Sequence, residues 1–219
     1  TNYSITIVDN GSFDNSISKF INDKDIHIIK INQNLGFSAG YNYAFSKLKS
    51  SKDKYYLILN NDTIININTI STLVKSTQKY GENNIYGPRI INYNNKKNWF
   101  CGGKINYITC HPYHRGLNTE NSIISFKSSF TNYISGCCML VSKDIINKLD
   151  GFNEKYSFYY EDVDLCIRAS KIDVSCVYIS SCSIEHMISH SMGGRYSLLK
   201  YITKIKSFIK FLYFNKNIF

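Results

Sequence analysis

Three carboxylates follow an aromatic cluster in the stretch FYYEDVDLCIRASK, residues 158–171. They belong to Glu161, Asp162 and Asp164, and the chemistry that such groups can perform is proton transfer. A carboxylate within about 2.6–3.2 Å of a hydroxyl group can accept its proton while that hydroxyl attacks another molecule. The positive end of a helix dipole would also favour acidic residues if a helix begins at Glu161. The stretch alone fits both interpretations.

Polar residues follow three apolar, β-branched runs elsewhere in the chain. They lie at 9–12 (DNGS), at 32–40 and at 60–62 (NND). In open α/β sheets, ligands bind beyond the carboxyl ends of the strands. Oxygen ligands there suit Mg²⁺ or Mn²⁺, which usually binds through one or two carboxylates plus substrate phosphates. Neither a G-x-G-x-x-G motif nor a phosphate-loop motif is present, which argues against a dinucleotide enzyme or a P-loop ATPase.

These residues need strands and helices to position them, and the pattern predicts both. Strands are expected at 3–10, 26–32 and 55–62, with helices at 15–23, 38–50 and 67–81. Continuous apolar strands separated by helices indicate a parallel sheet that is covered on both faces. The predicted class is therefore α/β, with a mostly parallel, Rossmann-like sheet flanked by helices.

The second half continues this pattern with a mixed sheet. Strands are expected at 122–130, 133–142 and 175–180, and helices at 143–149 and 161–171. We see no linker, repeat or low-complexity segment. The prediction is one domain over 1–192, followed by a basic amphipathic helix within 193–219.

Composition narrows the class of protein. The 219 residues are 43% hydrophobic and 15% aromatic, enough to bury a core and to argue against disorder. Seven cysteines without a C-x-x-C pair are read as reduced, buried thiols, which predicts a cytoplasmic location. No apolar run reaches the roughly 20 residues of a membrane-spanning helix, and no basic-then-apolar leader opens the chain. We therefore expect neither a membrane span nor secretion.

The formal net charge of +10 is concentrated at the C-terminal end, where no Asp or Glu follows His186. A helical wheel of YSLLKYITKIKSFIKFL, residues 196–212, places the apolar side chains on one face and four lysines on the other. This helix either packs on the domain with a solvated lysine face, or lies on an anionic membrane surface. Nucleic acid is disfavoured as a partner because no nucleic-acid-binding motif is present.

Five motifs resemble a known family in their order and spacing. They are IVDNGSFDNS, NLGFSAGYNYAF, LILNNDT, the stretch from SGCCML to CIRASK, and EHMISHS. Together, over about residues 4–192, they resemble a family 2 inverting glycosyltransferase of the GT-A fold, in the rhamnosyltransferase-like subgroup. The resemblance implies a nucleoside diphosphate sugar donor, a hydroxyl acceptor on a glycan or lipid-linked glycan, and Mg²⁺ or Mn²⁺. It also implies cell-surface polysaccharide biosynthesis, in the cytoplasm or peripherally on the inner face of the cell membrane.

The resemblance assigns the strand ends to the nucleotide and the metal. Asp9 matches the aspartate that binds the nucleobase, although an Asp before Asn-Gly also forms turns. Asp62 is the expected main anionic metal ligand, because Asn60 stands where the family's metal motif usually has its first aspartate. His186 matches a further metal ligand, with His190 as a weaker substitute. The segment beside the nucleotide matches at Asn34, Gly36, Gly40, Asn42 and Asn60; an ordinary loop is the alternative for these residues.

The resemblance also answers what the three carboxylates do. Asp162 matches the proposed general base, and Glu161 would position or bind the acceptor. Asp164 is expected to support or cap the helix. Gly136 and the aromatic run ending at Tyr160 would shape the acceptor side, although core packing accounts for these rings equally well.

One departure concerns the start of the chain. Family members normally begin with another strand and helix ahead of the segment that matches Thr1, so an unpaired strand edge is expected here. The alternative function is a catalytically silent module that keeps the fold and docks on membranes.

Overall fold

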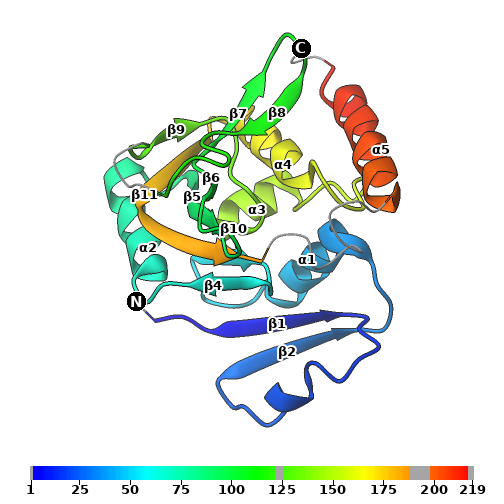
Figure 1. Ribbon diagram of the computed structural model, residues 1–219. Helices are drawn as coiled ribbons and strands as arrows, with labels where there is room; N and C mark the ends of the chain where they lie inside the picture. The colour runs from blue at the N-terminus through cyan, green and yellow to red at the C-terminus, as the bar shows by residue number, and fades with distance from the viewer. Residues whose placement is uncertain (1, 122–125, 188–197, 217–219) are drawn as a thin grey trace.

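The computed structural model describes residues 2–121, 126–187 and 198–216. Its first unit is a small parallel sheet of β1 (Ile5–Asn10) and β2 (Ile26–Ile31). In the described part of the chain, neither strand pairs with the larger sheet, and the small sheet lies at one end of the molecule (Figure 1). Helix α1 (Gly36–Lys47) follows and packs beside β1. The first strand predictions are confirmed.

The seven-stranded sheet forms the centre of the molecule. Its main path runs β3 (Tyr55–Leu59), β10 (Cys138–Ser142), β5 (Asn84–Asn92), β11 (Ser175–His186) and β4 (Thr63–Ile65). Strand β6 (Asn98–Phe100) pairs with β5, and β9 (Ser129–Thr131) pairs with β11. A separate hairpin, β7 (Gly103–Asn106) with β8 (His111–His114), projects from this body (Figure 1).

The larger sheet is more mixed than the sequence indicates. Only β5 and β11 run parallel within it, and its other described pairings are antiparallel. An apolar run indicates that a strand is buried on both faces. A mixed sheet that is covered on both faces buries its strands as fully as a parallel sheet does, so the pattern does not distinguish the two. The α/β class is confirmed, whereas a mostly parallel sheet is corrected to a mixed one.

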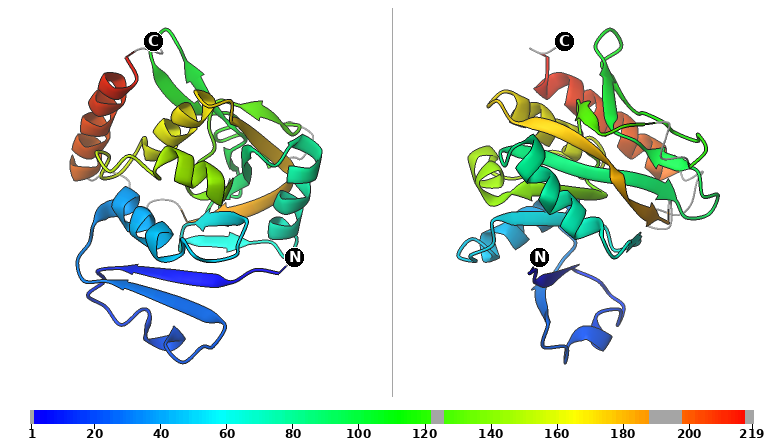
Figure 2. Two further views of the ribbon diagram at one scale, coloured as in Figure 1. Left: turned by 180° about the vertical axis from the view of Figure 1, so that it is seen from behind. Right: turned by 90° about the vertical axis from the view of Figure 1, so that its left-hand side faces the viewer.

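Helices cover the larger sheet and build its core. Helix α2 (Thr69–Tyr80) packs on β5 and β11, α3 (Lys143–Leu149) on β10, and α4 (Glu161–Ser170) on β11. Fully buried side chains come from these layers, among them Leu73, Ile85, Met139, Leu165 and Val177. The last helix, α5 (Leu198–Phe214), lies along the outer side of the molecule (Figures 1 and 2).

The helix predicted at 15–23 is wrong. The structure has only the short 3-10 helix η1 (Ser18–Phe20) there. Local side chains bind the backbone instead: Asp14 accepts the Ser16 N–H at 3.2 Å, and the Ser18 hydroxyl donates to the Asn15 carbonyl at 2.7 Å. Such bonds compete with the α-helical ladder.

Of the strand predicted at 122–130, only the last two residues lie in a strand, β9. Residues 122–125 lie outside the described part of the chain. His190 also lies outside it, so its role as a substitute ligand stays a prediction. In the part that the structure describes, no helix is long and apolar enough to cross a membrane.

Candidate active site

Two predicted metal ligands that lie 124 positions apart in sequence meet in the structure. Asp62 Oδ1 and His186 Nε2 are 3.1 Å apart. The meeting is fixed by strand pairing, because β4 begins directly after Asp62 and places Thr63 opposite His186, the last residue of β11. The Met187 N–H also donates to the Asp62 carbonyl at 2.9 Å. The backbone therefore sets this pair before any ligand arrives.

A divalent cation fits this pair of donors. Two neighbouring ligands of an octahedral ion with metal–ligand distances of about 2.1 Å lie about 3 Å apart, close to the separation of Asp62 Oδ1 and His186 Nε2. In the described residues no group of three or more His, Cys, Asp or Glu side chains could hold a metal. The protein would thus supply two ligands and leave the remaining positions to water and to phosphate oxygens.

The imidazole of His186 is held by aromatic packing. It is buried, and its ring stands edge-on to Trp99 with centroids 5.1 Å apart. The neighbouring His114 packs on the same indole at 4.3 Å, and its Nδ1 lies 3.1 Å from the Trp99 carbonyl oxygen. Burial lowers the pKa of His114 to about 4, so this second imidazole is neutral at physiological pH and would not repel a cation.

The predicted general base is presented by the first turn of α4. Asp162 Oδ2 accepts the Gly136 N–H at 2.9 Å, and Oδ1 accepts the Val163 N–H at 2.8 Å. Burial raises the pKa of Asp162, and these two N–H groups oppose that rise. Hydrogen bonds from N–H groups favour the charged form, so they limit the rise that burial causes in the pKa of Asp162.

Glu161 has the opposite environment. It is buried, and its Oε2 has no hydrogen-bond partner in the described part of the chain. Burial, with the charge of Asp162 as a second cause, raises the pKa of Glu161 to about 8. At neutral pH this group therefore holds its proton. Two adjacent acids with separated pKa values are suited to different roles.

The loop from Ser135 to Cys137 connects the two acidic centres. While the Gly136 N–H binds Asp162, the Cys137 carbonyl accepts the Asn60 N–H at 3.0 Å. Burial raises the pKa of the Cys137 thiol, and the charges of both Asp62 and Asp162 add to the rise. The metal pair and the base therefore flank one loop at the same end of β3 and β10.

The nucleotide edge is built around a residue that the sequence did not single out, Asn10. Its Nδ2 donates to the Gly36 carbonyl at 2.9 Å, and its Oδ1 accepts the Leu35 N–H at 3.0 Å. Asn34 Oδ1 accepts the Gly36 N–H at 2.8 Å. Gly40 faces the same amide, because a Cβ there would stand 2.9 Å from Asn10 Nδ2. The end of β1 is thereby locked to the start of α1.

Comparison with known proteins shows the family to which the chain belongs. The family model for Glycosyl transferase family 2 matches residues 1–150. The chain belongs to this family.

Two curated proteins are similar to this chain in sequence. N-acetylglucosaminyl-diphospho-decaprenol L-rhamnosyltransferase of Mycobacterium tuberculosis is 39% identical over 61 residues, which are 28% of this chain and 20% of that protein. Low-salt glycan biosynthesis hexosyltransferase Agl10 of Haloferax volcanii is 26% identical over 190 residues, 83% of this chain and 57% of that protein. The chain thus spans at most 57% of the length of these relatives.

Solved structures show the fold. GalNAc-T7, crystallised with UDP, GalNAc and Mn²⁺, superposes with a TM-score of 0.71 at 10% identity, over 95% of this chain and 41% of that one. S. aureus TarS 1–349 in complex with UDP superposes with a TM-score of 0.56 at 13% identity, over 85% of this chain and 51% of that one. The family 2 chain therefore has the predicted GT-A fold.

Several predicted site residues have structural contacts in this family 2 domain. Asp9 Oδ1 accepts the Ser12 N–H at 3.0 Å, as a turn-forming aspartate would. Asn42 accepts the Phe152 N–H at 2.8 Å and donates to the Phe152 carbonyl at 2.8 Å and to Glu154 Oε1 at 2.9 Å. The amide of Asn42 thus clamps the loop before α4 instead of facing the nucleotide edge. The hydrogen bonds of Asp9 leave nucleobase binding a prediction.

Tyr160 packs against α5. Tyr159 and Tyr160 both have left-handed backbone conformations, with φ of 68° and 70°. The Tyr160 ring contacts Phe208 and Phe211, with centroids 5.6 and 5.3 Å away. This contact supports the core-packing interpretation, and the predicted acceptor role of Tyr160 stays a prediction.

Asp164 supports the turn from behind, as expected. Its Oδ2 accepts Arg168 Nε at 2.8 Å, and its Oδ1 accepts the Tyr156 hydroxyl at 3.2 Å and Asn215 Nδ2 at 3.3 Å. Arg168 also binds the carbonyls of Leu149 and Gly151. This network ties α4 to α3 and α5.

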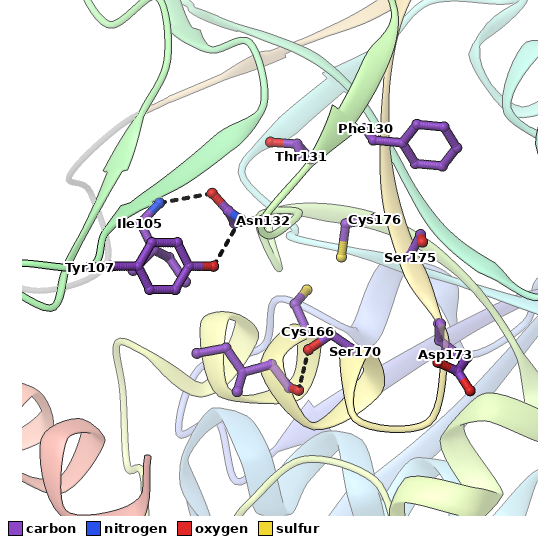
Figure 3. Close-up of a pocket in the computed structure, with 12 residues that line it drawn as sticks. Ile105, Tyr107, Phe130, Thr131, Asn132, Cys166, Ser170, Asp173, Ser175 and Cys176 are labelled. Atoms are coloured by element: carbon purple, nitrogen blue, oxygen red, sulfur yellow. Dashed lines mark hydrogen bonds between the residues drawn. The ribbon is translucent and has the colours of Figure 1, made fainter. Parts of the chain in front are cut away.

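A cavity of about 370 Å³ lies at the other end of α4 (Figure 3). Its walls include Cys166 and Ser170 of α4, Asn132, and Cys176 at the start of β11. None of the predicted site residues lines it. The cavity is therefore separate from the predicted site residues.

Proposed function

We propose that this chain is the catalytic domain of a metal-dependent, inverting glycosyltransferase. It would transfer a hexose or deoxyhexose such as rhamnose from a nucleoside diphosphate sugar to a hydroxyl of a glycan or lipid-linked glycan. The observation that carries the proposal is the attachment of both acidic centres to one loop. The Asp62–His186 pair suits a cation on the donor diphosphate, and Asp162 suits an acceptor hydroxyl beside it.

The proton chemistry follows from the environment of Asp162. The acceptor oxygen forms a bond to the anomeric carbon from the face opposite the diphosphate, and the bond from that carbon to the phosphate oxygen breaks. The hydroxyl proton passes to an Asp162 carboxylate oxygen, while the electron pair of the broken bond leaves with the diphosphate. Attack from the opposite face inverts the anomeric configuration.

Asp162 and Glu161 would have different roles in the reaction. Asp162 would accept the proton, and its two N–H partners favour the charged carboxylate that this role requires. Glu161 is protonated at neutral pH, so it adds no second negative charge beside the base and can donate a hydrogen bond to acceptor oxygen. A Mg²⁺ or Mn²⁺ ion held by Asp62 and His186 would stabilise the negative charge on the departing diphosphate.

Substrate classes come from the relatives' names. One names a rhamnosyltransferase acting on a diphospho-decaprenol substrate, the other a hexosyltransferase of glycan biosynthesis. Both names fit a role in cell-surface polysaccharide synthesis with a lipid-linked acceptor. The two solved neighbours were crystallised with UDP.

Product analysis tests the proposal. The protein is incubated with Mn²⁺, a panel of nucleoside diphosphate sugars and lipid-linked or free glycan acceptors. We expect release of nucleoside diphosphate and a glycoside of inverted configuration by NMR. A product of retained configuration would contradict the general-base role of Asp162. Absence of turnover and of nucleotide binding, with membrane binding intact, would instead establish the catalytically silent module.

A specific observation favours a second role, docking on an anionic membrane. Helix α5 attaches to the domain through Ser207, Phe211 and Asn215, all buried. The Ser207 hydroxyl donates to the Phe158 carbonyl at 2.6 Å. The face richest in aliphatic residues points elsewhere: Ile205 and Ile209 are each 60% exposed. At 100° per residue, Ile205 lies about 120° around the helix from Phe211.

The charge of α5 fits anionic lipid as the occupant of this face. Lys204 and Lys206 are exposed on either side of Ile205, and no acidic residue follows Glu185. An aliphatic stripe flanked by lysines suits a helix that lies in the headgroup region. The domain would then sit peripherally on the inner face of the cell membrane, where a lipid-linked acceptor is within reach.

A further inference from the structure

Arg89 of β5 is a buried cation that forms no ion pair with any residue that the structure describes. It is only 7% exposed, and its Nε and Nη1 have no hydrogen-bond partner in the described part of the chain. Arginine cannot discharge by losing its proton at ordinary pH. A buried charge without partners is costly, so natural proteins normally pair it. An anion that binds from solution would therefore compensate the buried charge of Arg89.

Arg89 lines a cavity of about 220 Å³. The other walls are residues 66–69 at the start of α2 and residues 180–183 of β11. The second wall exists because the register between β11 and β5 shifts between Ile179 and Ser183. Burial raises the pKa of Cys182 to about 12, and the nearby charge of Arg89 opposes that rise. The cavity thus lies beside Arg89, where the pairing of β11 with β5 is irregular.

The start of α2 adds a second source of positive potential. The helix is 12 residues long, its first turn has no acidic residue, and its N-cap residue Asn68 makes no capping hydrogen bond through its side chain. The first N–H groups of a helix carry partial positive charge and bind anions. Of the described residues that line the cavity, none is Asp or Glu.

The hydroxyl groups of the cavity wall complete a set of donors. Ser183 Oγ already accepts Asn66 Nδ2 at 3.0 Å, so its own proton is available for donation. Ser181 lies beside it in the irregular stretch. A guanidinium group, serine hydroxyls and a helix N-terminus are the donors that phosphate oxygens accept from.

We propose that Arg89, Ser181, Ser183 and the N-terminus of α2 form a binding site for a phosphate-sized oxyanion. This site is separate from the proposed donor site, because none of the predicted nucleotide or metal residues lines the cavity. Strand β4 nevertheless connects the two, since Asp62 comes directly before it and Asn66 directly after it. Anion binding would fix the end of β4 that lies away from the metal pair.

Thermal unfolding in phosphate tests the site. We compare the wild type with Arg89→Met in sodium phosphate and in sodium chloride of equal ionic strength. A bound anion stabilises the native state, so the wild type should gain about 3 °C or more in Tm from phosphate beyond the gain of the variant. The variant measures the general stabilising effect of phosphate. Equal gains in both proteins would overturn the proposal.

Two further measurements keep the test decisive if Arg89→Met folds poorly. In a ¹H–¹⁵N spectrum of the wild type, the amide signals of Ile70 and Ser71 and the Arg89 Nε–H signal should shift saturably as inorganic phosphate is added. The absence of saturable shifts would reject the site. Arg89→Lys, which keeps the charge but not the planar fork, should retain part of the phosphate effect, and Mn²⁺-dependent nucleotide binding should persist in it.

Discussion

The backbone N–H of Gly136 donates a hydrogen bond to Asp162 Oδ2 at 2.9 Å. Gly136 has little room for a side chain, because a Cβ there would lie 3.3 Å from Phe37 Cζ and 3.4 Å from Asp162 Cβ. The following residue, Cys137, uses its carbonyl to hold Asn60. One short loop therefore fixes the base relative to the turn that carries Asp62.

The first prediction concerns the base. Asp162→Asn keeps the size of the side chain and can still accept the Gly136 N–H, but it cannot take the acceptor proton. Turnover should fall about 10²–10⁴-fold. Donor affinity should change little, because the lost interaction belongs to the transition state. Steady-state kinetics with a saturating donor measure both quantities.

Glu161→Gln is the matched control for this base assignment. It should raise the acceptor KM more than it lowers kcat, because Glu161 is proposed to bind the acceptor and not to take its proton. Near-normal turnover of Asp162→Asn together with a collapse of Glu161→Gln would move the base to Glu161.

The second prediction concerns pH and stability. The pKa of Glu161 is about 8 in the native state, whereas the ordinary value of 4.5 applies to the unfolded chain. Between these two pH values the native state therefore binds more protons than the unfolded state. The stability from this group is fully present below about pH 4.5 and is lost as pH rises through about 8. Stability should fall by about 1 kcal/mol per pH unit within this window.

Glu161→Gln should flatten this slope, since the amide cannot ionise. Urea unfolding of both proteins between pH 5 and pH 9 measures the difference, with pH steps chosen to bracket the native pKa. Parallel pH profiles would show that Glu161 ionises in the native state as freely as in the unfolded chain.

The third prediction concerns the metal. Asp62→Ala should abolish Mn²⁺-dependent binding of a nucleoside diphosphate, and His186→Gln should weaken it, because these are the two side chains proposed as metal ligands. His111→Gln is the control, because His111 is an exposed histidine of β8. Calorimetric titration with and without Mn²⁺ gives the result. Undiminished binding by Asp62→Ala would remove the metal assignment.

The fourth prediction concerns α5. Lys204→Gln/Lys206→Gln should weaken binding to anionic liposomes by about tenfold or more, because each lysine near the headgroups contributes about 1 kcal/mol. Ile205→Ser/Ile209→Ser should weaken it as well, since both side chains are exposed. Sedimentation with vesicles of anionic and zwitterionic lipid measures binding, and added salt should reduce it.

Lys75→Gln/Lys79→Gln is the control, with the same charge change on exposed positions of α2. If both lysine pairs lower binding equally, only net charge matters and α5 is not the docking face. If neither does, another part of the protein covers the exposed stripe.

The fifth prediction concerns the support of the catalytic turn. Asp164→Ala removes the buried partner of Arg168, Tyr156 and Asn215, and should lower the free energy of unfolding by about 2–4 kcal/mol. Asn215→Leu removes the hydrogen bond that Asp164 accepts from the residue directly after α5. It should lower the free energy of unfolding by less than Asp164→Ala does. Urea unfolding compares the two, and an equal loss would show that the α5 contact carries the network.

Sequence patterns predicted most elements because their causes are local. The apolar runs at β1, β2 and β3, and the Ser142 cap whose Oγ accepts the Ile145 N–H at 3.2 Å, act over a few residues. The helix predicted at 15–23 failed for a local reason too, since hydroxyl and carboxylate side chains there bind the backbone. The family motifs singled out Asp62 and His186, which the structure brings to within 3.1 Å of each other, while their roles and that of Asp162 stay predictions.

The sequence by itself determined residue types, element types and family. Only the tertiary structure decided which partners the side chains have. Asn42 was predicted at the nucleotide, but Phe152 and Glu154, more than a hundred residues away, occupy its amide. In the sequence, Arg89 is an ordinary residue of a strand, and only the structure shows that it lines a cavity beside the register shift in β11. Long-range pairing fixes such contacts, and no short stretch of sequence records which strands will pair.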